Sequence, residues 1–537
     1  MDAISYAFGT NHFQNDADLQ AVLRHFWPDS LDKWPELIQF GQFSGTDVYE
    51  AVYHIDHDAP PVLIAHDLDG NRIDRIRLSP VEKQILANTA WIMAPPYQGQ
   101  GWPYHYALLY LLGDPGLGCV LTITGQTAYA LHKYAAGAIP EVAKITADLL
   151  SGRAWGATWM TESQGGSDLG ANETVAQQDG EIWRLTGDKY FASGAGLTDY
   201  ALTTARPLGQ KPGPKGLALF LLPRLNHQGD LNYHVRRLKD KSATRAVPSG
   251  EVELTHSEAY LIGRAEEGIY YTLETLTVSR LANAVVAMAT GKKAHLEVME
   301  RVQRRHSFGR VLQDHPLIRH DLTDLAVRSA AGLALAFYGV GKFDQAWDER
   351  PPYTGRYHLA RLVTHLAKNR TADHAASMTA TAMELFGGLG FLEEYAVARW
   401  HREALITPIW EGPSNIQALD FLESVQRHKA HRGLLEEMVP LLEQAHTPAA
   451  NQALETLEKT FHHLESVTNR EAQWYSKQDL SSVADAVQVA LLYDLAQDQG
   501  ERYAKLAELY EIRFMAHRDY PYWADEDPDI WGGQDHA

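Results

Sequence analysis

A run of small, hydroxyl-bearing and acidic residues at positions 160–168, Met-Thr-Glu-Ser-Gln-Gly-Gly-Ser-Asp, is the first segment with the chemistry of a binding site. Gly165 and Gly166 allow the backbone to approach a ligand closely. Free backbone N–H groups and the hydroxyls of Thr161 and Ser167 suit a pyrophosphate or the polar edge of a ring. Because the same residue types also form ordinary turns, a plain turn is the alternative interpretation.

A single carboxylate, Glu411, follows Trp410 in the segment 409–415. A carboxylate against an aromatic wall loses hydration, which raises its pKa toward that of a useful general base. The alternative is the start of a helix, with Ser414 or Asn415 as the cap and Glu411 in solvent. The pattern alone leaves both interpretations open.

Two further motifs suit a nucleotide. Arg305 and Phe308 are spaced so that a guanidinium holds a phosphate while the ring stacks on an adenine, although a basic last turn of a helix has the same residues. The segment 386–390, Phe-Gly-Gly-Leu-Gly, resembles part of a dinucleotide-binding motif. It follows a helical pattern rather than a strand, which favours a helix ending in glycine over a doubly wound nucleotide fold.

The elements that carry these motifs follow from hydrophobic periodicity. An Asp69-Gly70 turn between alternating segments predicts a hairpin, and the region 79–150 is mostly helical. Short strands separated by Gly/Pro turns predict a β sandwich or barrel over 156–262. The helical period then returns. One helix face is formed by Ala375, Met378, Ala382 and Leu385.

The sequence therefore predicts a multidomain α+β protein whose strands occupy a block of their own, rather than a βαβ alternation. Four domains are expected: an N-terminal hairpin extension and helical domain at 1–155, a central β domain at 156–262, a helical bundle with the catalytic base at 263–425, and an extra helical domain at 426–537.

Composition narrows the class of function. The 537 residues include 48 Lys and Arg against 68 Asp and Glu, a net charge of −20, which argues against nucleic acid or an anionic membrane as the main partner. The single cysteine excludes an internal disulfide and a cysteine zinc site, and the histidines lack metal-ligand spacing. With no apolar run of about 18 residues and no secretory signal pattern, a cytoplasmic protein without a membrane span is expected.

Together, the four motifs in this order resemble the acyl-CoA dehydrogenase family over about residues 85–422. The resemblance implies an N-terminal helical domain, a central β-barrel-like domain and a C-terminal four-helix bundle. It also implies noncovalently bound FAD and a homo-oligomer, usually a dimer of dimers.

The resemblance also implies a role for each residue that matches a motif. Thr161 is expected to bond the pyrimidine edge of the flavin, with Met160 beside it, and Ser167 to meet the pyrophosphate in the loop that contains Gly166. Phe191 would stack on the ring, and Ser193 would approach flavin N5. The remaining cofactor-binding residues are Arg305, Phe308, Gly387, Gly388, Trp410 and Asn415, the first four of them acting across the dimer. Glu411 matches the catalytic base, and Arg280 matches an arginine of the acyl-CoA site.

The residues within these motifs most resemble those of a longer branch of the family, the AidB-like adaptive alkylation-response flavoproteins. The N-terminal hairpin, the run from Lys239 to Arg245 and the extra C-terminal helices carry this resemblance. That branch is associated with DNA binding through its C-terminal domain. Here residues 426–537 contain 10 Lys and Arg against 20 Asp and Glu, a net charge of −10, so DNA binding by this route is not expected.

The expected activity is FAD-dependent α,β-desaturation of an acyl thioester. Glu411 would take the α-proton, hydride would pass to flavin N5, and an electron-transferring flavoprotein would serve as acceptor. One alternative is an AidB-like stress-response flavoprotein with weak dehydrogenase activity and a binding role. Another is a flavin oxidase of small acidic carbons such as nitroalkanes, whose relatives use an aspartate as base where this chain has Glu411.

Overall fold

The computed structural model of the chain describes residues 5–135, 137 and 139–532. The outer ends of the first and last predicted domains, residues 1–4 and 533–537, therefore lie outside the described residues. The chain forms two compact units. The sheet unit comprises Glu50–Gln100 and Asp114–Ser279, and the helical unit comprises Met1–Tyr49, Gly101–Gly113 and Arg280–Ala537.

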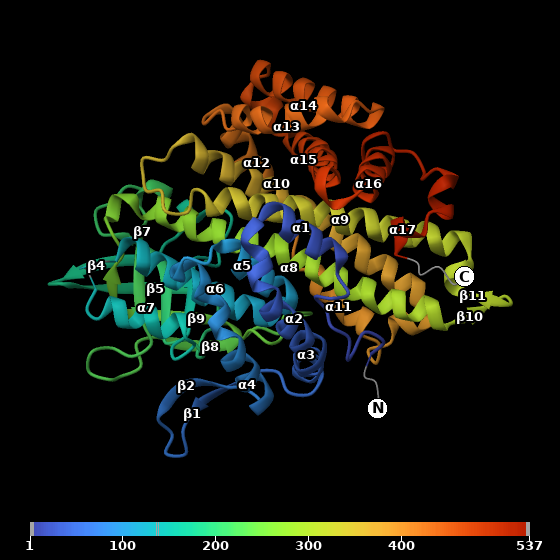
Figure 1. Cartoon of the computed structure of the whole chain (residues 1–537). Helices are drawn as coiled ribbons and strands as arrows, with labels where there is room; N and C mark the ends of the chain where they lie inside the picture. The colour runs from blue at the N-terminus through green and yellow to red at the C-terminus, as the bar shows by residue number, and fades with distance from the viewer. Residues whose placement is uncertain (1–4, 136, 138, 533–537) are drawn as a thin grey trace. The chain divides into compact units, whose positions relative to one another are not determined.

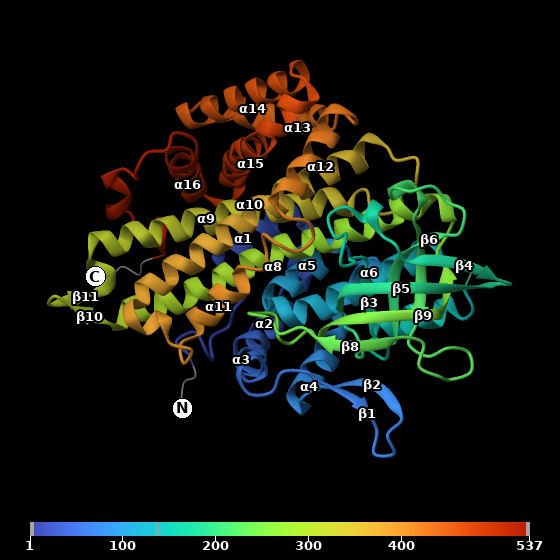
Figure 2. The same ribbon diagram turned by 180° about the vertical axis from the view of Figure 1, so that it is seen from behind.

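The sheet unit is built on a strongly curved sheet (Figure 2). Its strands are β3 (Gly156–Trp159), β4 (Val175–Asp179), β5 (Ile182–Ser193), β6 (Tyr200–Pro207), β7 (Ala218–Pro223), β8 (His234–Leu238) and β9 (Ser249–Leu261). They are ordered β3-β6-β4-β5-β9-β7, and β8 pairs with β9. Because β7 also pairs with β6, the strands from β6 to β7 close on themselves, as in a barrel. The predicted block of short strands is thus confirmed.

Strand β7 shows how this sheet is held. Five consecutive residues, Ala218–Leu222, are buried, as expected of a strand covered on both faces. Phe220 packs into a core cluster with Trp159, whereas Leu219 and Leu221 pack into a second cluster that contains residues of helix α6 (Pro115–Tyr134). Side chains of a strand alternate between faces, so one strand contributes to both cores.

Helices and a hairpin complete the sheet unit. The predicted hairpin is confirmed as β1 (Val62–His66) and β2 (Arg72–Arg77), which pair antiparallel. The helices are α3 (Tyr49–His57), α4 (Pro80–Thr89), α6 and α7 (Val142–Leu150). Asp114 caps α6 by accepting a hydrogen bond from the Leu117 amide, which fixes where that helix begins.

The long helices of the helical unit include α8 (Gly268–Arg304), α9 (Pro316–Asp344) and α10 (Gly355–Phe386). Helix α8 begins in the sheet unit and continues in the helical unit from Arg280. Helices α9 and α10 run side by side (Figure 1). The predicted apolar face of α10 is buried throughout. The shorter helices are α1 (Ala17–Phe26), α2 (Trp34–Phe43), α5 (Trp102–Leu112), α11 (Ala396–Ala404) and α12 (Ser414–Gln426).

The C-terminal region is helical, as predicted. It consists of α13 (His431–Ala445), α14 (Pro448–Ser466), α15 (Asn469–Gln499), α16 (Arg502–Tyr510) and α17 (Pro528–Trp531). A buried polar network joins it to α10: Asp485 of α15 accepts from Arg370 at 2.6 Å and from the Tyr510 hydroxyl at 2.6 Å. The extension is therefore packed against the helical bundle. The division into four domains stays a prediction.

Candidate functional site

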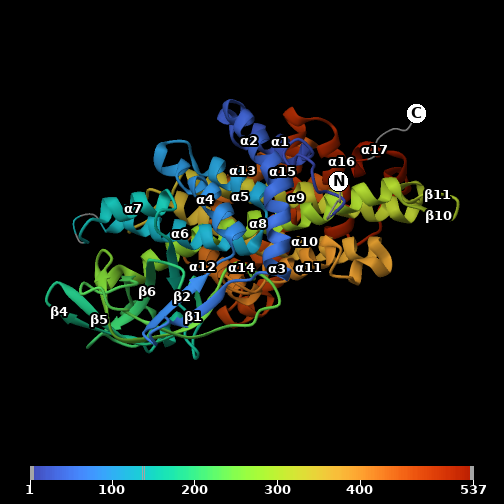
Figure 3. The same cartoon turned by 90° about the horizontal axis from the view of Figure 1, so that it is seen from below.

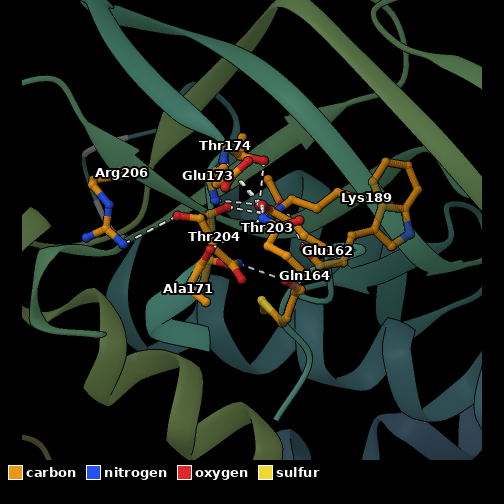
Figure 4. A network of polar contacts seen from close by, with 12 residues as sticks. Glu162, Gln164, Ala171, Glu173, Thr174, Lys189, Thr203, Thr204 and Arg206 are labelled. Carbon is orange, nitrogen blue, oxygen red and sulfur yellow. Dashed lines mark hydrogen bonds and ion pairs between the residues drawn. The ribbon is translucent and has the colours of Figure 1, made fainter. Parts of the chain in front are cut away.

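The predicted flavin loop is organised around a buried ion pair of the sheet unit (Figure 4). The Lys189 ammonium, on β5, lies 2.8 Å from the Glu162 carboxylate and also donates to the Thr204 carbonyl at 2.8 Å. Glu162 further accepts from the Glu173 amide at 2.6 Å and from the Thr174 hydroxyl at 2.6 Å. Burial by itself raises the pKa of Glu162, but Lys189 and these hydrogen bonds outweigh it and lower that pKa.

The predicted ligand-binding residues flank this pair. Met160 is buried, and its carbonyl accepts from the buried Asn172 amide at 2.8 Å. Thr161 is half-buried, and Gly166 and Ser167 are exposed. In the described part of the chain, the Thr161 and Ser167 hydroxyls and the Gly166 amide donate no hydrogen bond. The loop is thus held from inside while its outward donors stay available, which fits a ligand rich in acceptor atoms.

A bulge in β5 determines how Phe191 is presented. The pairing of β5 with β9 shifts register between Lys189 and Ala192, and both of those residues are buried. The extra residue leaves Tyr190 and Phe191 facing outward together, with 54% of Phe191 exposed. Two residues after Phe191 on the same strand, Ser193 places its Oγ 3.0 Å from the Ser249 Oγ. An aromatic face and a hydroxyl therefore follow one another at this end of β5.

In the helical unit, Glu411 lies in a turn between α11 and α12 and has a φ of 57°. This left-handed conformation is uncommon for a residue other than glycine and costs about 1–3 kcal/mol. Helix α12 begins at Ser414 after Pro413, with no side-chain cap, so neither Ser414 nor Asn415 caps it. Asn415 is exposed in the first turn. The turn before α12 is therefore not an ordinary capped helix start.

Neighbouring side chains hold the turn. Arg280 of α8 donates from Nε to the Glu411 carbonyl at 3.0 Å and pairs with Asp420 at 2.9 Å. The Trp410 indole N–H donates to Asn283, one turn further along α8. Glu411, Trp410 and Arg280, predicted from separate motifs, are thus brought together along α8.

Arg305 and Phe308 lie at the far end of α8, just beyond its last residue. A hairpin of β10 (His306–Ser307) and β11 (Arg310–Val311) projects there (Figures 1 and 3), with Phe308 95% exposed at its tip. Positive φ values at Phe308 and Gly309 are those of a tight type I′ turn. Arg305 is exposed and forms no ion pair with the described residues. The motif is therefore on a hairpin and not within the last helical turn.

Gly387 and Gly388 lie beside this end of α8. Helix α10 ends at Phe386, and the Phe386 carbonyl accepts from the buried Arg301 of α8 at 3.1 Å. Gly387 has a φ of 63°, which matches the predicted alternative of a helix ending in glycine. Both glycines are exposed, and no atom lies within 4 Å of where a Cβ would stand on either. Close approach of another molecule is therefore open there.

Several contributors were not predicted. Lys189 and Asn172 belong to none of the candidate sites named from the sequence, yet Lys189 pairs with Glu162, and the buried Asn172 amide donates to the Met160 carbonyl of the predicted flavin loop. Lys368 and Gln417, which donate to the Gly412 carbonyl at 2.8 and 2.9 Å, carry no sequence signal of their own. Gly412 is 44 residues from Lys368 and 5 residues from Gln417 in the chain.

Two classes of feature are absent from the described residues. No group of three or more His, Cys, Asp or Glu side chains there is arranged to hold a metal ion. None of the helices in the described ranges is both long and apolar enough to cross a membrane.

Comparison with known proteins identifies relatives of this chain. Residues 157–257 match the middle domain of acyl-CoA dehydrogenases, and residues 266–426 match their C-terminal domain. AidB of Escherichia coli (strain K12) is 30% identical over 425 residues, which are 75% of this chain and 76% of AidB. Acyl-CoA dehydrogenase family member 11 of Caenorhabditis elegans is 28% identical over 77% of this chain and 70% of its own length.

A solved structure extends the likeness to nearly the whole chain. Caenorhabditis elegans ACDH-11 in complex with C11-CoA superposes with a TM-score of 0.84 and 23% identity, covering 99% of this chain and 96% of that one. This match supports a common fold that includes the C-terminal helices. From its sequence relatives and its two matched domains, the chain belongs to the acyl-CoA dehydrogenase family.

Proposed function

We propose that this protein is an FAD-dependent dehydrogenase that introduces an α,β double bond into an acyl-CoA thioester. The observation that carries the proposal is the turn at Glu411: a carboxylate-bearing residue in a left-handed conformation, within the matched C-terminal domain and held by buried side chains. Strained backbone of this kind persists where the surroundings over-determine it, and such positions cluster at reactive sites.

In this proposal Glu411 accepts the α-proton of the thioester on its carboxylate. The electron pair of that C–H bond becomes the new π bond between Cα and Cβ, while the β-hydrogen leaves with its own electron pair. FAD, when bound, supplies the acceptor for that hydride. An electron-transferring flavoprotein is the proposed acceptor of the electrons from the reduced cofactor.

The chain offers suitable groups for FAD in each unit. In the sheet unit, the Thr161 and Ser167 hydroxyls and the Gly166 amide donate no hydrogen bond to the described residues. Phe191 lies in the β5 bulge, and Ser193 follows that bulge. In the helical unit, the proposed cofactor contacts are Arg305, Phe308, Gly387, Gly388, Trp410 and Asn415. Arg280 is proposed for the acyl-CoA site, where Asp420 and the Glu411 carbonyl already orient its guanidinium.

The length of α8 supports a homo-oligomer. At a rise of about 1.5 Å per residue, Arg280 and Arg305 lie about 37 Å apart along the helix. Glu411 lies beside Arg280, at a distance from the hairpin that follows Arg305. If Glu411 and this hairpin each contact a flavin, they contact two different flavins. We therefore propose that the hairpin reaches the cofactor of another copy, in a dimer or a dimer of dimers.

The substrate class follows from the relatives. Acyl-CoA dehydrogenase names recur among them, and the superposed ACDH-11 structure contains C11-CoA. We propose an acyl-CoA as substrate. A panel of acyl-CoAs of different chain length, each mixed anaerobically with the FAD-loaded protein, would identify the substrate by loss of the visible flavin absorbance.

The decisive variant is Glu411→Gln. The amide keeps the volume of the side chain but accepts no proton, so flavin reduction by acyl-CoA should slow by roughly 10²–10⁴-fold. The flavin spectrum and the acyl-CoA affinity should change little. The exposed Glu394→Gln is the matched control. Reduction within about tenfold of wild type would mean that the base is elsewhere or that the substrate is not an acyl thioester.

A further inference from the structure

Side chains from three helices donate hydrogen bonds to the backbone of the Glu411 turn. Arg280 of α8 and Gln417 of α12 donate to the Glu411 carbonyl at 3.0 and 2.9 Å. Lys368 of α10 and Gln417 donate to the Gly412 carbonyl at 2.8 and 2.9 Å. Two successive carbonyl groups thus receive four hydrogen bonds from side chains that are all buried.

The orientation of the Gln417 amide is itself fixed. His365 Nδ1 lies 2.9 Å from Gln417 Oε1, and burial lowers the pKa of His365 to about 3, so its ring is neutral. An amide oxygen only accepts hydrogen bonds, so the single ring proton is assigned to Nδ1. The Gln417 NH₂ group is then left to face both carbonyls of the turn.

Lys368 is the unusual member of this group. It is one of the largest fully buried side chains of the protein. Burial lowers its pKa to about 7, an effect increased by Arg280 of α8 and opposed by Glu411 of the turn and Asp373 of its own helix. A buried amine is costly unless it is hydrogen-bonded, and its Nζ is placed on the Gly412 carbonyl. A leucine or methionine would fill the same space without that cost.

We propose that Lys368 and Gln417 are positioning residues, which hold Glu411 in its left-handed turn so that its carboxylate stays aligned with the α-carbon of the substrate. The inference rests on the proposed function and deepens it. Neither residue reacts: Lys368 acts through the Gly412 carbonyl, and Gln417 acts through the carbonyls of residues 411 and 412. The buried donors offset the cost of the strained backbone, which a free loop would relieve by rotating Glu411 away.

The test uses Lys368→Met and Gln417→Leu in the FAD-loaded protein. Because a shift of about 1 Å in a reacting group costs about 10²-fold in rate, flavin reduction at saturating acyl-CoA should slow by about that factor. The dissociation constant of acyl-CoA should change less than about threefold. Lys342→Met, which removes a partly buried lysine paired with Glu437, is the matched control and should keep the wild-type rate.

The pH profile separates positioning from a loss of packing. In Lys368→Met a cation that interacts electrostatically with Glu411 is lost, so the acid limb of the reduction rate should move to higher pH. Gln417→Leu removes no charge and should lower the rate without moving that limb. Lys368→Gln keeps a donor but no charge, so it should recover part of the rate while retaining the shifted limb.

Crystal structures of the variants decide the question independently of turnover. Loss of the positive φ at Glu411 in either variant supports the inference. Retention of that φ together with wild-type reduction overturns it. If none of the acyl-CoAs in the panel reduces the flavin of the wild-type protein, the proposed function fails. The φ of residue 411 in the variants still decides whether Lys368 and Gln417 position the turn. Should Lys368→Met fail to fold, Gln417→Leu carries the same comparison.

Discussion

Two glutamates of this chain are held in opposite ways. Around Glu162 of the sheet unit, the donors converge on the carboxylate itself: Lys189, the Thr174 hydroxyl and the Glu173 amide all bind its oxygens. Around Glu411 of the helical unit, buried donors bind the backbone carbonyls of residues 411 and 412. The donors around Glu162 fix the position of its carboxylate within the loop, whereas the donors around Glu411 fix the backbone from which its side chain extends.

The sharpest way to break this comparison is to remove the cation of the structural pair. Lys189→Met leaves the buried Glu162 without its ion partner, and breaking a buried pair from one side costs about 3–5 kcal/mol. Chemical denaturation should show that loss in the free energy of unfolding. The control is Lys144→Met, because Lys144 and its ion-pair partner Glu141 are equally exposed. This substitution should leave the free energy of unfolding almost unchanged. A small loss for Lys189→Met would mean that the remaining hydrogen bonds suffice for Glu162.

The second prediction concerns Arg305, whose charged side chain forms no ion pair with the described residues. Arg305→Ala should weaken FAD binding by about 1.5–3 kcal/mol, the value of a hydrogen bond to a charged group, without lowering stability. Isothermal titration of the apoprotein with FAD measures the loss. Arg304→Ala, which breaks a surface ion pair with Glu300, serves as the control. Unchanged affinity would assign Arg305 to the helix end alone.

The pH dependence of stability sharpens the role of Glu162. Its pKa is lowered in the folded protein, so its contribution is fully present above the unfolded value of about 4.3 and is lost as pH falls through the folded pKa. The stability difference between wild type and Glu162→Gln should therefore be largest at neutral pH and narrow in acid. Denaturation midpoints across acidic pH measure this difference. A gap that stays constant would show that the ionised form is not what stabilises the loop.

The smallest expected effect is on DNA. The region 426–537, with a net charge of −10, should not retard duplex DNA at physiological salt, because binding requires cations that displace the counterions of phosphate. An electrophoretic mobility assay with the full protein tests this. Submicromolar, salt-sensitive retardation would contradict the charge argument and favour an AidB-like binding role.

Much of the fold could be predicted because periodicity reports local structure. The alternation around Asp69-Gly70 and the 3-4-3 spacing on α10 both identify elements that the structure contains. The bulge that exposes Phe191 could not be predicted, because it depends on how β5 pairs with β9, and not on β5 alone. Register shifts of this kind leave no mark in the sequence of one strand.

The motif residues of the candidate site could be predicted from the sequence, but the side chains that hold them in place could not. Glu411 stood out because a carboxylate beside Trp410 is locally unusual. Its supports lie elsewhere in the chain: Lys368 is 44 residues from Gly412, and Arg280 is 131 residues from Glu411. A lone lysine within a helical stretch resembles any surface lysine until tertiary packing buries it. Three-dimensional contact, not local pattern, is what distinguishes it.

The strand β7 has a consequence for how this family member can diverge. Five successive side chains, Ala218–Leu222, divide between two separate cores. A substitution at Phe220 needs compensation among one set of neighbours, and one at Leu221 needs it among another. Substitutions at neighbouring positions of this short segment therefore need compensating changes in different cores, so its sequence should diverge slowly.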